Sequence, residues 1–337
     1  MTRRATRFAA AVVACTALGC TADRSALSPG GPAARVLANL GWPLLLGFLA
    51  VSAVMWGLIA WVAWRRTGTL EEHAPPDAKG GLRWVAIGGF VIPAIAFAAT
   101  FVATINSLSA FPMDHHPHAE AEIRVLGHQW WWEVQYRMGD VSDYFTTANE
   151  IHIPAGRPVD LQLVSDDVIH SFWAPRLHGK VDLVPGMDNR IRLQADRRGV
   201  YHGACAEFCG LQHAHMRFVV VADDPAAFDA WLEHERHPAA SRGLSAAAER
   251  GKTVFNGGPC VLCHTVRGTD ARGTIGPDLT HFAERRLIAA ALPQDVATLH
   301  SWVTNAPSLK PGTFMPALTQ FTGSELQDLV AYLQTLK

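Results

Sequence analysis

The chain has 337 residues, and its 29 lysines and arginines nearly balance 30 aspartates and glutamates, so the formal net charge is −1. A chain with this balance and no basic cluster lacks the positive surface that nucleic-acid binding requires. Hydrophobic residues make up 49% of the sequence. At this length, the composition indicates membrane-spanning segments together with more than one soluble domain.

The N-terminus has the layout of a secretory signal. Three arginines within the first seven residues precede an apolar run over residues 8–18, and small residues lead up to Cys20. This order is typical of a signal peptide that is removed after export, so residues 1–20 are predicted to be one. The four residues that end at Cys20 loosely match a lipoprotein cleavage box, which leaves lipidation of Cys20 and ordinary cleavage nearby as two alternatives.

A membrane hairpin is predicted over residues 40–105. The apolar stretches 40–64 and 84–105 each exceed the roughly 20 residues that cross a hydrocarbon core. Basic residues, Arg65 and Arg66 among them, lie in the short segment between the stretches, and the positive-inside rule places this segment in the cytoplasm. Both ends of the hairpin, with the soluble part that follows, are then expected on the outer, periplasmic side of a bacterial cell membrane.

Short β-rich runs alternate with turn residues from residue 111 to residue 224. Examples are Ile123-Arg-Val-Leu, Val159-Asp-Leu-Gln-Leu-Val and Asn189-Arg-Ile-Arg-Leu-Gln. Several short strands separated by turns are typical of a β-sandwich or barrel. The pattern therefore predicts a β-sandwich domain over residues 111–224.

Soft metal donors gather in the twelve residues from Cys205 to Met216, which also include Cys209 and His213. A mononuclear electron-transfer copper uses one thiolate, two imidazoles and a weak thioether, so a second cysteine requires either two metals or a different chemistry. His170, flanked by apolar residues ahead of a proline, can supply a second imidazole. Two copper ions bridged by both thiolates fit this donor set best.

These stretches, together with Gly127-His-Gln-Trp-Trp-Trp-Glu and Lys180-Val-Asp-Leu-Val-Pro-Gly, resemble subunit II of haem-copper cytochrome c oxidases. The resemblance spans residues 40–222 and implies a cupredoxin-like barrel for the β domain. It also implies that the copper-ligand loop lies at one end of that barrel, between rigid strands.

The resemblance implies a role for each donor of a binuclear Cu(A) centre. The implied set is Cys205 and Cys209 as bridging thiolates, His170 and His213 as nitrogen ligands, and Met216 and the backbone carbonyl of Glu207 as weak axial donors. In that family the Glu207 side chain would also face a magnesium ion at the border with the catalytic subunit.

The run Trp130-Trp131-Trp132 has two interpretations. Aromatic residues on a strand more often pack in a core than act in function, and two of the three are expected to do so. In the resembling subunits, the first tryptophan after Gly-His-Gln is exposed near the copper and receives electrons from soluble cytochrome c. Trp130 is therefore the candidate for electron entry.

A second cofactor site is predicted near the C-terminus. Cys260-Val-Leu-Cys263-His264 matches the c-type haem attachment pattern, in which both thiols form thioethers and the histidine binds iron. Downstream, Gly276-Pro277 resembles the haem-packing segment of class I cytochromes c, and Met315 offers a distal thioether ligand. Ligation by Met and His raises the haem potential and leaves no open position for substrate, which suits an electron carrier.

An all-α cytochrome c domain is expected over residues 244–337, after a polar, flexible linker over residues 234–243. Predicted helices are residues 245–255, capped by Ser245, and residues 295–304. A capping box is predicted at Ser324-x-x-Gln327, ahead of a final helix.

The sequence thus predicts a multi-domain membrane protein with a two-helix hairpin, a cupredoxin-like domain and a class I cytochrome c domain. By resemblance it is an oxidoreductase component, the electron-input subunit II of a respiratory cytochrome c oxidase. Electrons from a cytochrome c, or from a quinol:cytochrome c reductase complex, would pass through one covalent haem c and Cu(A) to catalytic subunit I, which reduces oxygen to water with the other oxidase subunits. No oxygen-binding site is expected in this chain.

Two alternatives remain open. A Cu(A)-bearing input subunit of a nitric oxide reductase would use every ligand named above. A membrane-tethered copper-delivery or thiol-exchange protein could use Cys205 and Cys209 with a distant histidine, although that class accounts for neither Met216 nor the haem motif.

Overall fold

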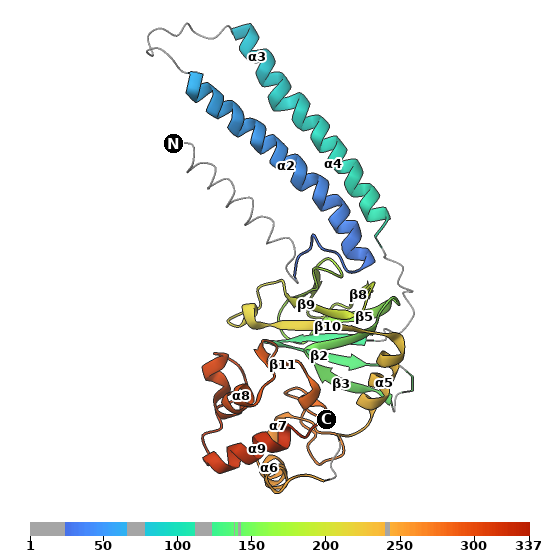
Figure 1. Cartoon of the computed structure of the whole chain (residues 1–337), viewed down its shortest axis with the longest axis vertical. Coiled ribbons are helices and arrows are strands. Elements are labelled where there is room, and N and C mark those ends of the chain that lie inside the picture. Colours follow the sequence, from blue (N-terminus) through green and yellow to red (C-terminus); the bar gives the residue numbers. More distant parts are fainter. Residues whose placement is uncertain (1–23, 66–77, 112–122, 138, 141–142, 240–242) are drawn as a thin grey trace, which may run out of the picture. The chain divides into compact units, whose positions relative to one another are not determined.

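The computed structural model describes residues 24–65, 78–111, 123–137, 139–140, 143–239 and 243–337 (Figure 1). The predicted signal peptide and the lipidation alternative at Cys20 lie outside these residues. The chain divides into two compact units, one made of residues 1–34 with 113–337 and the other of residues 35–112.

Two long apolar helices make up the described part of the second unit, and the first of them begins at Pro32, just before that unit. They are α2 (Pro32–Arg65) and a continuous helical stretch made of α3 (Ala78–Ala86), the π-helical η2 (Ile87–Val91) and α4 (Ile92–Ser109). Both have a mean hydropathy of 2.2 over 18 residues, and within the described part of the chain they are the two helices long and apolar enough to cross a membrane. The predicted spans 40–64 and 84–105 fall inside them.

The β domain consists of two five-stranded sheets within the described residues. In spatial order, the first sheet contains β3 (Phe145–Ala148), β2 (Trp131–Tyr136), β1 (Ile123–His128), β5 (Val159–Ser165) and β8 (Asn189–Leu193). The second contains β4 (Glu150–Pro154), β10 (Arg217–Asp223), β9 (Gly199–Cys205), β6 (His170–Trp173) and β7 (Val181–Leu183). The predicted sandwich is confirmed, since three of the β-rich runs form β1, β5 and β8.

Alternating side chains of the two sheets form the core between them. Trp132 of β2 is fully buried and meets Phe172 and Phe218 edge-on, with ring centroids 6.2 and 5.3 Å away. Phe172 and Phe218 stack on each other at 4.4 Å. Because β6 and β10 carry these two rings, the aromatic core supports the strands from which the copper-ligand candidates extend.

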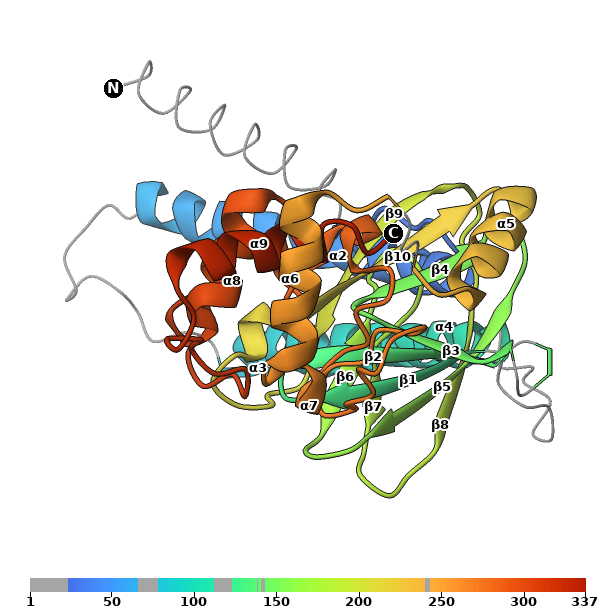
Figure 2. The ribbon, with the colours of Figure 1, turned by 90° about the horizontal axis from the view of Figure 1, so that it is seen from below.

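The helical domain contains α6 (Ala246–Gly257), α7 (Cys260–Cys263), α8 (Val296–Leu309) and α9 (Gly323–Leu333), with a 3-10 turn η5 (Phe282–Glu284) and the short strands β11 (Leu287–Ile288) and β12 (Leu292–Pro293). Figure 2 shows α6 and α9 lying side by side. At their crossing, a Cβ on Gly251 would be 1.9 Å from the carbonyl oxygen of Asp328, so the helices approach this closely only because residue 251 is glycine.

Two of the predicted helix starts are confirmed and one is wrong. Ser245 caps α6 by accepting from the backbone of Ala248, and Asp295 caps α8 in the same way. The capping box of α9 is Thr322 with Glu325, not Ser324 with Gln327. Glu325 accepts a 2.7 Å hydrogen bond from the Thr322 backbone, which a charged carboxylate makes more strongly than a glutamine amide would.

The predicted linker over residues 234–243 is partly ordered structure. It begins inside α5 (Pro225–Arg236), whose buried face carries Phe228 and Leu232. The Arg236 carbonyl accepts a hydrogen bond from Arg267, and the His237 carbonyl is 2.9 Å from Nε2 of His281. Residues 240–242 of the predicted linker lie outside the described residues. The start of this segment is therefore held against the helical domain by specific contacts.

Candidate metal centre and haem crevice

Neighbouring strands bring the predicted copper ligands together. His170 is the first residue of β6, Cys205 is the last residue of β9, and Met216 directly precedes β10. The strand β9 pairs with both others, so these three residues start from adjacent positions at one end of the sandwich. The connecting loop is folded on itself, since the backbone N–H of Cys205 donates to the Met216 carbonyl at 2.9 Å.

The donor atoms converge as a compact group. The two sulfurs of Cys205 and Cys209 are 3.7 Å apart and do not form a disulfide. Each sulfur has one imidazole beside it, with Nδ1 of His170 at 3.9 Å from Cys205 and Nδ1 of His213 at 3.6 Å from Cys209. The Met216 sulfur is 3.8 Å from that of Cys209. One histidine per thiol is the arrangement that two metal ions sharing both sulfurs would need.

The remaining predicted donor lies on the other side of the pair. The carbonyl oxygen of Glu207 is 3.2 Å from the Cys205 sulfur. The Glu207 side chain is 43% exposed and forms a 3.3 Å ion pair with Lys180. The carboxylate thus has a lysine partner within the described residues, and its predicted role toward magnesium stays a prediction.

Burial and hydrogen bonding prepare the site for soft metals. Cys209 and His170 lower the pKa of the Cys205 thiol well below its ordinary value, against the effect of burial. The contact with Cys205 and burial raise the pKa of Cys209, so the pair holds one thiolate and one thiol before a metal displaces the remaining proton. Thiolate is the form that binds metals. Cys205, Cys209, His170 and Met216 are all buried, so few water molecules can compete for an ion bound there.

Asp167 holds the His170 ring in place. Its Oδ1 is 2.7 Å from Nε2 of His170, and its Oδ2 accepts from the backbone N–H of Gln129, also at 2.7 Å. Burial lowers the pKa of His170, but the contacts with Asp167 and Cys205 outweigh it and raise the pKa overall. The carboxylate therefore selects the Nε2–H form of the neutral ring, leaving Nδ1 free to face the sulfurs.

Replacing Asp167 by alanine is expected to weaken copper binding by roughly 10–100-fold, the usual cost of losing a group that orients a metal-binding histidine. The Asp167→Asn variant keeps a side-chain oxygen that can accept from Nε2 and should retain most of the affinity. Competition against a copper chelator measures both. Asp166→Ala is the control, because the Asp166 side chain is 72% exposed and lies 3.7 Å from His128. Equal affinities for Asp167→Ala and Asp166→Ala would contradict the orienting role.

A second residue makes room for the same ring. Gly127 of β1 lies against His170, and a Cβ there would be 2.6 Å from Cδ2 of the imidazole. Any larger residue would have to displace the ring. The glycine of the Gly-His-Gln motif is thus a packing requirement of the metal centre.

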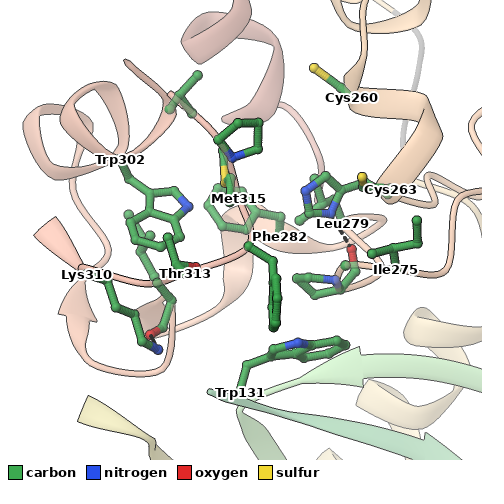
Figure 3. A pocket seen from close by; sticks show the side chains of 18 of the residues that line it. Trp131, Cys260, Cys263, Ile275, Leu279, Phe282, Trp302, Lys310, Thr313 and Met315 are labelled. Carbon is green, nitrogen blue, oxygen red and sulfur yellow. Dashed lines mark hydrogen bonds between the residues drawn. The ribbon is translucent and has the colours of Figure 1, made fainter. Parts of the chain in front are cut away.

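The haem attachment motif forms one wall of a cavity in the helical domain. Figure 3 shows Cys260, Cys263 and Met315 around this cavity, which His264 also lines. Nδ1 of His264 is 2.8 Å from the Pro277 carbonyl and must donate to it, so Nε2 keeps its lone pair for a metal. Burial lowers the pKa of His264, which favours that neutral form. Both cysteines are free thiols, and the lining is largely apolar, so a covalently attached porphyrin fits.

Gly276 lets the chain pass close beside this histidine. A Cβ at residue 276 would be 2.7 Å from Cε1 of the His264 ring. The Gly276-Pro277 segment therefore supports the proximal ring through one close contact and one hydrogen bond.

The structure corrects one expectation for Trp130. It is only 8% exposed, because residues of the helical domain cover it, and a Cβ on Gly312 would be 3.4 Å from its ring. Its indole N–H donates to the Cys209 carbonyl at 2.9 Å, and Trp130 is also among the residues that line the haem cavity. A separate cytochrome c therefore finds no exposed Trp130 in this conformation. Trp132 packs in the core as expected.

Sequence reasoning missed three residues that lie where the copper domain meets the helical domain. Trp131 lies at one wall of the haem cavity (Figure 3). Lys310, at the end of α8, is 5% exposed and donates to the carbonyls of Trp130 at 2.6 Å and Ala289 at 2.9 Å. Gln212, next to His213, donates to the Pro311 carbonyl at 2.7 Å. The bond from Gln212 joins residues 99 apart in the chain, and the bond from Lys310 to Trp130 joins residues 180 apart. No local sequence motif could have revealed either contact.

Both the β domain and the helical domain match families of known proteins. Residues 121–223 match the family described as "Cytochrome C oxidase subunit II, periplasmic domain", and residues 248–337 match the family "Cytochrome c". The chain is 34% identical over 336 residues to cytochrome c oxidase subunit 2 of Alkalihalophilus pseudofirmus, covering 95% of this chain and 93% of that protein.

Two further similarities were found, one to a sequence and one to a solved structure. The chain is 30% identical over 290 residues to cytochrome c oxidase subunit 2 of Bacillus sp. strain PS3, covering 81% of this chain and 79% of that protein. Among solved structures, the periplasmic domain of subunit II of the cytochrome oxidase of Bradyrhizobium japonicum is 27% identical, covers 36% of this chain and 97% of that chain, and gives a TM-score of 0.33.

Two apolar helices, a cupredoxin-like sandwich and a cytochrome c domain define a membrane-anchored electron-transfer subunit. The chain belongs to the cytochrome c oxidase subunit 2 family and carries a cytochrome c domain at its C-terminus. Membership implies copper and haem binding, a general role in electron input to a terminal oxidase, and association with a catalytic subunit I and other oxidase subunits.

Proposed function

We propose that this chain passes electrons from a cytochrome c or a donor complex, through one covalent haem c and a binuclear Cu(A) centre, to the catalytic subunit that reduces oxygen to water. The observation that carries the proposal is the position of Trp130. Trp130 is one of the residues that line the haem cavity, while its indole N–H is bonded to the carbonyl of Cys209. One residue thus adjoins both candidate cofactor sites.

In this proposal the ligands keep the roles that the sequence predicts. The copper ligands are Cys205, Cys209, His170, His213, Met216 and the Glu207 carbonyl, and the haem is held by Cys260, Cys263, His264 and Met315. When bound, the two groups supply one-electron redox chemistry at potentials that their ligands set. The chain itself contributes the fixed donor geometry and the low exposure of both sites.

The chain also determines where electrons can enter and leave the haem crevice. On one side, the crevice is closed by Trp130 and Trp131 of the copper domain. On its rim, Leu262, Ile275 and Phe314 are 69%, 71% and 76% exposed. A donor can therefore approach the exposed apolar rim, while the tryptophan side leads toward the copper ligands. This assigns Trp130 to internal transfer, in place of entry from a soluble carrier.

The proposal is tested in the assembled oxidase by rapid mixing with reduced cytochrome c. Reduction of haem c should precede reduction of the copper centre, and metal analysis with copper EPR should give two coppers per haem c iron in this chain, with one unpaired spin shared by both. In a Cys260→Ala/Cys263→Ala variant, which cannot attach haem, copper reduction should become much slower. Copper reduction at the unchanged rate would overturn the proposed route.

A further inference from the structure

A second group of metal-binding side chains lies away from both cofactor sites. It contains His234 at the end of α5, His281 just ahead of η5, and Glu284 at the end of η5. One ring nitrogen from each histidine and one carboxylate oxygen all lie within 4.8 Å of one another. The α5 helix follows the last strand of the copper domain, whereas η5 belongs to the cytochrome c domain.

His281 has an unused lone pair. Its side chain is 2% exposed, and its Nε2 lies 2.9 Å from the His237 carbonyl, to which it must donate. Its Nδ1 is buried and has no hydrogen-bond partner. A buried nitrogen that stays unpaired costs free energy unless something binds it. A histidine held by a backbone carbonyl through one nitrogen is also the usual arrangement of a metal ligand.

The side chains of His234 and Glu284 are exposed enough to rotate toward a shared metal ion. His281 and Glu284 are three residues apart around a 3-10 turn, which places both on the same side of it. Nε2 of His234 is already 2.9 Å from Glu284, and these two side chains are 45% and 41% exposed. Zinc bonds of about 2.0–2.1 Å place neighbouring ligands about 3.4 Å apart. Small rotations of the two exposed side chains reach that spacing.

We propose that His234, His281 and Glu284 form a zinc site that fastens the cytochrome c domain to the copper domain. Two imidazoles and one carboxylate are a ligand set that zinc uses, and the exposed side leaves the fourth position to water. The ion replaces the direct pairing of His234 with Glu284 and takes up the lone pair of His281. This site contains no soft sulfur, so it does not share the ligand chemistry of the copper centre.

Burial, reinforced by the nearby His234 and Arg267, lowers the pKa of His281, so its ring is neutral at physiological pH. Zinc binding there need not displace a proton from this buried nitrogen. The proposal depends on neither the copper nor the haem assignment, since none of its three ligands belongs to those sites.

The test is equilibrium dialysis of the full chain, with haem and copper already loaded, against buffered zinc, followed by elemental analysis. The chain has other histidines, including His115, His116 and His118. The readout is therefore the difference between variants. The wild type should bind one zinc equivalent more than His234→Gln and one more than Glu284→Gln. Both variants change exposed side chains, so they should fold.

His237→Gln is the matched control, because its side chain is 68% exposed, pairs with Glu233 and is outside the cluster, while its backbone carbonyl remains. It should keep the full zinc content. Hydrogen exchange adds a second readout, in which zinc should slow exchange of α5 and η5 together in the wild type and in His237→Gln only. Equal zinc content in the wild type and in either ligand variant, or loss of zinc in His237→Gln, would overturn the proposal.

Discussion

The Cys209→Ser variant is expected to lose the binuclear copper centre. Its sulfur lies close to three other donors, with Cys205 at 3.7 Å, His213 at 3.6 Å and Met216 at 3.8 Å. A serine hydroxyl is a hard donor that cannot bridge two coppers as a thiolate does. Copper content should fall from two to at most one. Electron flow to the catalytic subunit should fall by at least about 100-fold. Removing a ligand costs more than removing a residue that only orients a ligand, and the latter typically costs roughly 10–100-fold.

Copper analysis and oxygen uptake of the assembled oxidase measure this result, with haem c absorbance as an internal check. Haem c should still be reduced by the donor, because its ligands are untouched. His215→Gln is the control, since His215 lies in the same loop but its Nδ1 contacts Gln212 at 2.7 Å. That control should keep two coppers. Two coppers in Cys209→Ser would show that Cys209 does not bridge.

The Lys310→Met variant is expected to loosen the cytochrome c domain from the copper domain. Lys310 Nζ supplies hydrogen bonds to the buried Trp130 carbonyl and the half-buried Ala289 carbonyl, and methionine leaves both acceptors unpaired. Each unpaired group costs about 1–3 kcal/mol, and about 1.4 kcal/mol corresponds to a tenfold change in an equilibrium. The ratio of docked to undocked domain should therefore fall about tenfold or more, and internal transfer from haem to copper should slow accordingly.

Flash reduction of the haem followed by copper absorbance measures this rate in the intact chain. Lys337→Met is the matched control, because Lys337 is an exposed lysine of the same domain. It should transfer electrons at the wild-type rate. An unchanged rate in Lys310→Met would mean that other contacts, such as Gln212 with Pro311, hold the domain without it.

The same lysine gives a pH signature. Burial lowers the pKa of Lys310 to about 8, whereas the unfolded chain keeps the ordinary lysine pKa of about 10.4. Between these values the unfolded state binds more protons, so the free energy of unfolding gains a term that rises with pH. The stability difference between wild type and Lys310→Met should therefore shift in favour of the wild type from pH 8 upward. Parallel curves would show that Lys310 is not buried as described.

Local chemistry made the ligand residues predictable, and long-range packing made the rest unpredictable. Cys205, Cys209, His213 and Met216 lie in one short segment, and the haem motif is shorter still, so spacing makes them candidates. His170 was a candidate from its flanking residues, and the resemblance to a known family supplied the role of each proposed copper ligand. Asp167, by contrast, is one acidic residue among several, and only the fold shows that it faces the His170 ring.

The error at the start of α9, and two features that the sequence did not reveal, have similar causes. Both Thr322-x-x-Glu325 and Ser324-x-x-Gln327 match the capping pattern, and only the backbone geometry selects the first. The polar composition of residues 234–243 predicted a linker, yet the beginning of that segment is helical and bonded to the helical domain. In the resembling subunits the tryptophan at this position is exposed, whereas Trp130 is buried under residues of the helical domain, and its role in electron entry stays a prediction.

The covering of Trp130 has a kinetic consequence. In the proposed route, transfer between haem and copper takes place within one chain, across the interface that the Lys310 and Gln212 contacts hold, so it should be a first-order event whose rate is independent of donor concentration. Because those contacts are buried, it should also be nearly insensitive to ionic strength. Any dependence of oxidase turnover on salt or on donor concentration would then come only from the binding of the donor to the exposed haem rim.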